Sequence, residues 1–340
     1  MKGMRVALLG FGSVGQGVAR MLGEKDLPLT ITAIADSKGG VIDPEGISLP
    51  EVFSRKEKTG RCGKPGRPKG AKGPEVTALD IVRSDAYDAL VEVTPTSMQT
   101  GEPALTHIRT ALGLGRHVVT SNKGPIALAH RELTALAARK GVALRYEATV
   151  CGAIPIIRTL RDGLLGNEVK ALFGVMNGTC NYILTRMEDE GLTYDQALGE
   201  AQEMGYAEKD PTYDVKGLDT AIKLVILANT VWEMDAKLED VDVTGIDLIT
   251  PQAIQLAMDE EVAVRLIGEA IPSRKLLRVS PRIIPRSHPL LVEGTLNAVT
   301  VVTDMAGELT FIGKGAGAVE TASAVIGDLL SIREQYDRRP

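Results

Sequence analysis

Short, mainly apolar runs alternate with longer amphipathic segments along roughly the first 150 residues of this chain. The runs at 6–9, 31–35, 89–94, 117–120 and 142–147 have the length and composition of strands, and helical patterns fill 102–114 and 126–140. Strands that alternate with helices in this way build a doubly wound, mainly parallel sheet. We therefore predict an α/β fold for this part of the chain.

The second half of the chain follows another pattern. An apolar helix is expected to contain Asp219 and the run 224–227, and strands are expected at 277–284, 298–303 and 309–312. Gly307 turns the chain between the last two strands, which makes them a hairpin. A final helical pattern covers 319–332. This order of elements predicts an α+β region after the α/β part.

Glycines mark the first turn between a strand and a helix. The segment Gly10-Phe11-Gly12-Ser13-Val14-Gly15 follows the strand at 6–9, and the next strand ends in Asp36. In such a turn the first glycine permits the bend, the second lets the backbone approach a pyrophosphate, and the third lets the helix pack on the strand. Asp36 is placed to accept a hydrogen bond from a ribose hydroxyl. A glycine-rich turn without a ligand is the alternative, but the spacing to Asp36 favours a dinucleotide site.

The residues near Asp36 leave the choice between NAD and NADP open. The carboxylate repels a 2′-phosphate, which favours NAD, whereas Lys38, Lys56 and Lys58 are basic side chains of the kind that accommodate the phosphate. We expect both cofactors to bind.

Composition narrows the class of protein. The 340 residues suffice for two domains, and 44% hydrophobic with 24% charged residues is ordinary for a globular protein. The net charge of −5 disfavours a dedicated nucleic-acid binder, and no apolar run approaches the ~20 residues that cross a bilayer. Cys62, Cys151 and Cys180 fit neither a disulfide framework nor a zinc site. We expect a cytoplasmic protein without a signal peptide, with reduced thiols and with no membrane or nucleic-acid partner.

One basic segment, residues 55–72, departs from this composition. The segment contains many lysines and arginines but a single acidic residue, Glu57, and glycines and prolines lie among them. Such a composition is typical of a solvated loop. We predict a loop or a lid beside the cofactor, and contact with nucleic acid is the alternative.

Residues 205–223 concentrate carboxylates around a turn that leads into the apolar helix. Asp219 and Lys223 stand four residues apart, so they share one face of that helix. Taken alone, the pair is most simply a surface ion pair worth a few tenths of a kcal/mol. A lysine held by carboxylates at the edge of an apolar segment is also suited to anchor a substrate or transfer a proton, and the dinucleotide motif favours this second interpretation.

Four further residues stand at the carboxyl ends of predicted strands. Thr94 and Pro95 close one strand, and Asn122 and Lys123 follow another. Ligands of parallel sheets bind at this edge. We expect these residues to line the cofactor crevice, and we favour a catalytic role for Lys123 over a surface cap.

Taken together, these segments resemble homoserine dehydrogenase over nearly the whole chain. The resemblance rests on the glycine turn, on Thr120-Ser121-Asn122-Lys123-Gly124-Pro125, on Asn177-Gly178-Thr179-Cys180-Asn181-Tyr182 and on the block from Gly205 to Lys223. It implies the interconversion of L-homoserine and L-aspartate 4-semialdehyde by hydride transfer with NAD or NADP. This reaction belongs to threonine, methionine and isoleucine biosynthesis.

The resemblance also implies roles for single residues. Lys223 and Lys123 match the family's candidates for proton transfer, and Asp219 matches the carboxylate that orients Lys223. The implied substrate contacts are Glu208, Asp214, Tyr206, Asn177, Gly178 and Thr179. Gly315 is an implied cofactor contact in addition to the residues named above.

The segment 147–154 resembles the family's site for a monovalent cation. The implied ligands of Na⁺ or K⁺ are Glu147 and the carbonyl oxygens of Val150, Gly152 and Ile154, because hard cations prefer oxygen. Cys151 stands where a glycine is usual, and the resemblance leaves open whether this residue alters the carbonyl geometry of the site. Glu320 stands where a proline is usual, so we expect a looser start of the last helix.

The resemblance further implies a discontinuous Rossmann-type domain. Residues 1–145 and 313–340 are expected to bind the dinucleotide, and 146–312 to form the substrate-binding, catalytic and dimerisation region. We expect a homodimer of the short form, without a regulatory domain and with weak or absent inhibition by threonine.

Two other functions stay open at this point. An enzyme like aspartate-semialdehyde dehydrogenase needs a nucleophilic cysteine with a histidine partner, and neither Cys151 nor Cys180 has a paired histidine motif. A non-enzymatic NAD(P)-binding regulator shares the nucleotide motif but has no need of a second substrate site, which the block at 205–223 predicts.

Overall fold

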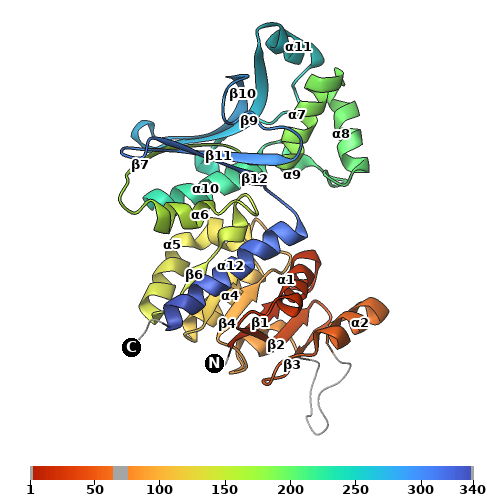
Figure 1. Ribbon diagram of the computed structural model, residues 1–340, viewed down its shortest axis with the longest axis vertical. Coiled ribbons are helices and arrows are strands. Elements are labelled where there is room, and N and C mark those ends of the chain that lie inside the picture. The colour runs from red at the N-terminus through yellow and green to blue at the C-terminus, as the bar shows by residue number, and fades with distance from the viewer. Residues whose placement is uncertain (1–2, 64–75, 338–340) are drawn as a thin grey trace. The chain divides into compact units, whose positions relative to one another are not determined.

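The structure is a computed structural model that describes residues 3–63 and 76–337, and the chain divides into two compact units (Figure 1). The first unit holds the chain up to Thr149 and again from Gly317 onward. The second unit runs from Val150 to Ala316.

A mainly parallel sheet forms the centre of the first unit. Its strands are β1 (Met4–Leu9), β2 (Leu29–Asp36), β3 (Gly39–Ile42), β4 (Ala89–Glu92), β5 (His117–Thr120) and β6 (Leu144–Arg145). Over the described residues their order is β3-β2-β1-β4-β5-β6, and β3 pairs antiparallel with β2 while the other neighbours pair in parallel. The strand order reverses between β1 and β4, which is where ligands of such sheets bind. The predicted α/β fold is confirmed.

The helices of the first unit accompany this sheet, and two pairs of them contact each other closely. They are α1 (Ser13–Glu24), α2 (Leu49–Thr59), α3 (Ala78–Val82), α4 (Ala104–Gly113), α5 (Lys123–Lys140) and α12 (Ala318–Asp337). Figure 1 shows α1 and α12 side by side against the sheet, and α4 packs against α5.

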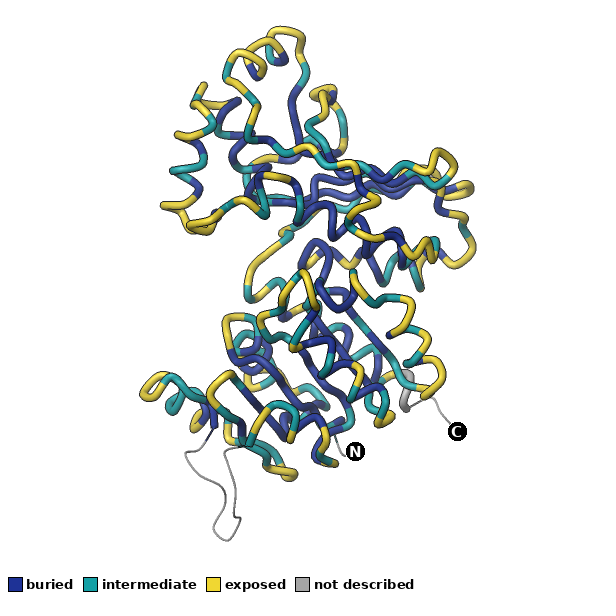
Figure 2. The backbone as a smooth tube through the Cα atoms, turned by 180° about the vertical axis from the view of Figure 1, so that it is seen from behind, coloured by how far each residue is buried: buried dark blue, intermediate teal, exposed yellow. Residues whose placement is uncertain are grey.

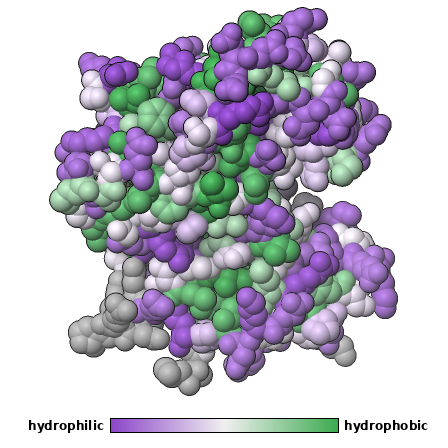
Figure 3. All heavy atoms as spheres, turned by 45° about the horizontal axis from the view of Figure 1, so that its top comes forward, coloured by the Kyte–Doolittle hydropathy of each residue, from purple (hydrophilic) through white to green (hydrophobic). Residues whose placement is uncertain are grey.

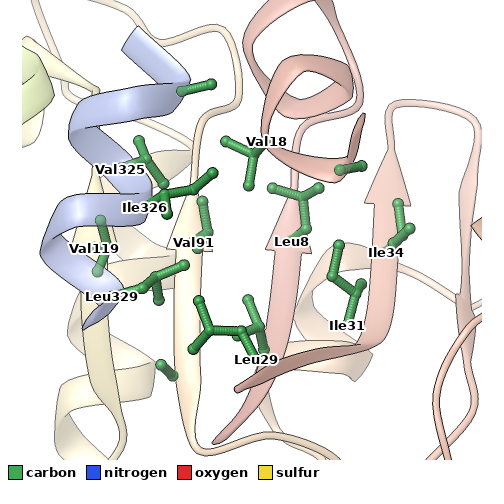
Figure 4. Close-up of a cluster of buried hydrophobic side chains, with 14 of the residues drawn as sticks. Leu8, Val18, Leu29, Ile31, Ile34, Val91, Val119, Val325, Ile326 and Leu329 are labelled. Atoms are coloured by element: carbon green, nitrogen blue, oxygen red, sulfur yellow. The ribbon is translucent and has the colours of Figure 1, made fainter. Parts of the chain in front are cut away.

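The last helix completes the core of the first unit. Val325, Ile326 and Leu329 of α12 lie against Val91 and Val119 of the central strands (Figure 4). Burial of each such side chain contributes roughly 1.5–3 kcal/mol. The helix therefore belongs to this unit although unit 2 precedes it in the chain.

The second unit is built on a mainly antiparallel sheet. Its strands are β7 (Val169–Val175), β8 (Asp242–Val243), β9 (Val262–Ile271), β10 (Leu276–Pro285), β11 (Leu296–Thr303) and β12 (Glu308–Lys314). Over the described residues their order is β12-β11-β7-β9-β10-β8, with only β8 and β10 paired in parallel. The helices are α6 (Ile156–Arg158), α7 (Gly178–Glu190), α8 (Tyr194–Glu203), α9 (Thr212–Val215), α10 (Leu218–Trp232) and α11 (Pro251–Asp259). The apolar helix α10 packs on β9 and β10.

Several element boundaries differ from those expected. β4 ends at Glu92 and β6 has only two residues, while α5 begins at Lys123 rather than at 126. β7 and β9 lie outside the strands that the pattern predicts. Glu320 lies in the first turn of α12, where the helix dipole favours a carboxylate.

Buried residues concentrate in the strands, and exposed residues lie on turns and outer helix faces (Figure 2). Hydrophilic residues surround smaller apolar areas on the face drawn in Figure 3. Within the described part of the chain no helix is long and apolar enough to span a membrane.

Candidate active site

Asp219 and Lys223 form a buried ion pair inside the second unit. They stand one turn apart on α10, with Lys223 Nζ 2.7 Å from Asp219 Oδ2, and each side chain is only 8% exposed. The same Nζ donates to the carbonyl oxygen of Met176 at 2.6 Å. The interpretation of this pair as a surface ion pair is therefore wrong.

Asn177 connects the pair to a second carboxylate. It caps α7, because its Oδ1 accepts a hydrogen bond from the backbone N–H of Cys180 at 2.8 Å. This bond fixes the orientation of the amide, so Nδ2 donates to Asp214 Oδ1 at 2.7 Å and to Asp219 Oδ2 at 2.9 Å. One side chain thus begins a helix and also orients two carboxylates.

The charges in this cluster are set by burial and by neighbours. Burial disfavours the charged form of Lys223, but Asp219 outweighs burial, and the pKa of Lys223 is raised above its ordinary value. Lys223 is therefore an ammonium near neutral pH. Two carboxylate side chains, Asp214 and Asp219, lie in this cluster with the ammonium of Lys223, and carboxylates attract a cationic group of a substrate.

The other predicted substrate contacts surround this cluster unevenly. Thr179 Oγ1 donates to the carbonyl oxygen of Tyr206 at 2.7 Å, and the Tyr206 ring lies 4.9 Å from that of Tyr182. Gly178 lies so close to the chain at Thr295 that a Cβ there would be 2.8 Å from the carbonyl oxygen. Glu208 is exposed, and its described hydrogen bond uses its backbone oxygen, not its carboxylate.

The glycine turn of the first unit is tightly packed at two glycines and open at the third. A Cβ on Gly10 would lie 2.4 Å from the carbonyl oxygen of Val93, and one on Gly15 would lie 2.0 Å from that of Gly10. Gly12 instead faces open space, with nothing within 4 Å of its Cβ position. No side-chain hydrogen bond caps α1 and no acidic residue lies in its first turn, so its N–H groups suit an anion.

Asp36 is held by three donors at the end of β2. Its carboxylate accepts from Lys56 Nζ at 2.7 Å, from Lys38 N at 2.8 Å and from Cys62 N at 2.9 Å. Burial raises the pKa of Asp36, but the hydrogen bond from Lys56 and the backbone bonds outweigh it, so the pKa is lowered. The side chains of Lys38 and Lys58 are exposed, and the basic segment from residue 64 on lies outside the described residues.

A buried carboxylate that the sequence analysis missed lies at the end of β4. Glu92 has no exposed surface and accepts from Thr94 Oγ1 at 2.5 Å, from His107 Nδ1 at 3.2 Å and from Asn122 Nδ2. Asn122 is the N-cap of α5, so Lys123 is the first residue of that helix. An acidic residue inside the apolar run 89–94 is the signal that points to this group.

The residues of the predicted cation site belong to different units. Glu147 lies in the first unit, where its N–H donates to Asp328 Oδ2 at 2.9 Å, and Val150, Gly152 and Ile154 lie in the second. Cys151 adopts a φ of +55°, the left-handed conformation that favours glycine. Gly315 lies in the second unit, where its carbonyl oxygen would be 2.7 Å from a Cβ on Gly152. Within the described residues no group of three or more His, Cys, Asp or Glu is placed to hold a metal ion.

The four histidines bond to groups other than cysteine. His117 Nδ1 accepts from Ala143 N, His130 Nε2 bonds to Tyr146 Oη, and His288 Nδ1 accepts from Leu290 N. Cys62, Cys151 and Cys180 form no disulfide and are buried. In these three contacts the partner of the histidine is a backbone N–H or a tyrosine hydroxyl, which gives no support to a cysteine nucleophile.

Comparison with known proteins identifies the family. The homoserine dehydrogenase profile matches residues 155–330, and that of glutamate/leucine/phenylalanine/valine dehydrogenase matches residues 1–82. The chain is 44% identical to a homoserine dehydrogenase of Methanocaldococcus jannaschii, over 97% of this chain and 98% of that one. It is 34% identical to an NAD(+)-dependent homoserine dehydrogenase of Pseudomonas canavaninivorans, over 98% and 97% of the two chains. A hyperthermophilic archaeal homoserine dehydrogenase solved in complex with NADPH is 30% identical, covers 98% of each chain and superposes with a TM-score of 0.82. The chain therefore belongs to the homoserine dehydrogenase family, whose members are NAD(P)-dependent oxidoreductases.

Proposed function

We propose that the buried cluster of Lys223, Asp219, Asn177 and Asp214 is where this enzyme binds L-homoserine and L-aspartate 4-semialdehyde as they interconvert. The observation that carries the proposal is the ammonium of Lys223 held between Asp219 and the carbonyl oxygen of Met176. A charged amine that is fixed beside buried carboxylates suits proton transfer to a substrate oxygen.

Substrate binding follows from the charges of the two molecules. Both carry an α-ammonium and an α-carboxylate. Carboxylates attract the ammonium, for which Asp214 and Glu208 are the proposed partners. Asn177, Gly178, Thr179 and Tyr206 complete the proposed substrate site, with backbone N–H groups at the start of α7 as donors for the carboxylate.

Proton transfer is assigned to Lys223. The bound nicotinamide supplies or takes the hydride. In the direction of reduction, Lys223 gives a proton to the aldehyde oxygen as that oxygen becomes a hydroxyl. In the direction of oxidation, the neutral amine takes the hydroxyl proton back. Asp219 orients Lys223, and Lys123 is the second proposed lysine of the reaction.

The dinucleotide is assigned to the first unit. The proposed contacts are the turn Gly10 to Gly15, Asp36, Lys38, Lys56, Lys58, Thr94, Pro95, Asn122 and Lys123, with Gly315 from the second unit. The domain bounds inferred from the resemblance, 1–145 with 313–340 for the dinucleotide and 146–312 for substrate and dimerisation, stay a prediction. Lys56 beside Asp36 offsets the repulsion between that carboxylate and a 2′-phosphate, which supports binding of NADP as well as NAD.

A monovalent cation and a homodimer complete the proposal. The proposed ligands are Glu147 and the carbonyl oxygens of Val150, Gly152 and Ile154, and the left-handed backbone at Cys151 and Gly152 turns the chain sharply between them. If these carbonyl oxygens and Glu147 bind the ion, replacing Na⁺ and K⁺ in the assay with a large organic cation should lower the activity. Light scattering of the purified protein tests the dimer, and cell fractionation tests the cytoplasmic location expected for amino-acid biosynthesis.

The first experiment compares two lysine variants. Lys223→Met should lower homoserine-dependent reduction of NAD and NADP by about 10³-fold or more, because it removes the proton-transferring group. Lys216→Met is the matched control, since Lys216 lies close by in sequence but forms a largely exposed pair with Asp247. Binding of NADPH, followed by its fluorescence, should be unchanged in both variants. Full activity of Lys223→Met would overturn the assignment.

A further inference from the structure

The buried carboxylate of Glu92 controls the hydrogen-bonding character of two proposed cofactor contacts in the first unit. It accepts from Thr94 Oγ1 and Asn122 Nδ2, and its remaining described partner is His107 on α4. The backbone oxygen of Glu92 also accepts from Thr120, which in turn accepts from the N–H of Asn122. The end of β4 is thus bonded directly to the start of α5.

A carboxylate has acceptors only, so each of its partners must donate. Asn122 therefore turns its NH₂ toward Glu92, which leaves its oxygen Oδ1 on the other side of the amide. The hydroxyl hydrogen of Thr94 is likewise committed to Glu92, and only its lone pairs are left for a ligand. Asn122 and Thr94 are both partly exposed at the carboxyl edge of the sheet, whereas Glu92 is fully buried.

We infer that Glu92 is a positioning residue that makes this edge of the sheet selective for a cofactor ring carrying a hydrogen-bond donor. The nicotinamide ring bears a carboxamide whose NH₂ is such a donor. With Glu92 in place, Asn122 Oδ1 and Thr94 Oγ1 offer acceptors to that NH₂, while Thr94 has no hydrogen left to donate and the second hydrogen of Asn122 stays on the Nδ2 that faces Glu92. The inference rests on the proposed placement of the dinucleotide in the first unit.

Two dinucleotide analogues test the inference by binding alone. Thionicotinamide adenine dinucleotide keeps the NH₂, and 3-acetylpyridine adenine dinucleotide carries a methyl group in its place. Their Kd values are measured by competition against NADPH fluorescence. The acetylpyridine analogue should bind the natural protein about fivefold more weakly, the effect of one neutral hydrogen bond.

Variants then show which residues set the ratio of the two Kd values, that of the acetylpyridine analogue divided by that of the thionicotinamide analogue. Glu92→Gln should bring the ratio close to one, because a glutamine can accept or donate and so allows Asn122 to present its NH₂. Thr94→Val removes one acceptor from a partly exposed position and should lower the ratio without loss of the fold. Tyr87→Phe is the control, since Tyr87 is buried just before the opposite end of β4 and bonds to the carbonyl oxygen of Val82. It should keep the ratio of the natural protein.

The possible outcomes distinguish failure of the inference about Glu92 from failure of the proposed dinucleotide site. Equal affinities of the two analogues for the natural protein, or an unchanged ratio in folded Glu92→Gln, overturn the inference alone. If Glu92→Gln does not fold, an unchanged ratio in Thr94→Val overturns it. Failure of NADPH and of both analogues to bind the natural protein overturns the nucleotide site together with the inference.

Discussion

At the scale of single residues, the chemistry of Lys223 depends on which carboxylate stands beside it. Burial alone would favour the neutral amine, but Asp219 raises the pKa of Lys223, so the side chain is charged near neutral pH. A charged lysine can donate a proton to the substrate at once. It must first lose that proton before it can accept one from the substrate. Reduction and oxidation should therefore respond differently to pH.

The pH profile of the two directions tests this difference. As pH rises from 7 to about 9.5, the neutral fraction of Lys223 grows about tenfold per unit, since its pKa lies above this range. We expect kcat/KM for homoserine oxidation to rise with that fraction, and kcat/KM for semialdehyde reduction to stay level. Asp219→Asn removes the main raising influence and should shift the oxidation profile to lower pH. Level profiles in both directions would argue against Lys223 as the proton carrier.

The thiols should be unreactive in the folded protein. Burial, reinforced by Asp36, raises the pKa of Cys62 to about 12, and burial with Asp214 and Asp219 raises the pKa of Cys180 well above its ordinary value. We expect Ellman's reagent at about pH 8 to modify Cys62, Cys151 and Cys180 quickly only in guanidinium. Rapid modification of a native thiol with loss of activity would instead favour a cysteine nucleophile.

At the scale of elements, two helix caps look alike but have different roles. Thr193 caps α8 in a capping box with Gln196, and Asn177 caps α7 through Cys180. Only Asn177 also donates to the carboxylates of Asp214 and Asp219. A cap stabilises a helix by about 1 kcal/mol, whereas a donor to buried carboxylates also fixes their positions.

Alanine at each cap separates the two roles. Thr193→Ala should lower the free energy of unfolding by about 1 kcal/mol and leave kcat/KM unchanged. Asn177→Ala should lower stability at least as much and reduce kcat/KM by about tenfold or more, because two carboxylates lose a donor. Urea unfolding and steady-state kinetics measure the two effects. Equal kinetic losses would show that cap stability, not contact with the carboxylates, controls activity.

The sequence predicted the elements whose signals are local. The glycine turn predicts the start of α1, and the spacing of Asp219 and Lys223 predicts that they share one face of α10. Contacts between distant segments carry no such signal: the bond of Lys56 to Asp36 and the donors around Glu92 come from separate elements. β9 was missed because Arg265 and Glu269 interrupt its apolar pattern, although both are buried.

At the scale of the molecule, the first unit depends on a helix that is remote in sequence. Leu329 of α12 is fully buried, in the same core as β1 and β4. Leu329→Ala should lower the free energy of unfolding by about 2–5 kcal/mol through lost burial and the cavity left behind. Val319→Ala on the same helix is the control, since Val319 is 61% exposed, and it should change stability by less than about 0.5 kcal/mol. Denaturant titration compares them, and similar small effects would mean that α12 adds little to this core.

The place of α12 in the chain also sets an order of events during synthesis. The ribosome synthesises Val150–Ala316 before Ala318–Asp337, so the first unit still lacks Val325, Ile326 and Leu329 throughout the synthesis of the second. Until then the incomplete first unit exposes the apolar face of its sheet to chaperones and to other nascent chains. The core of the first unit, whose synthesis begins before that of the second, therefore becomes complete only when α12 has been made.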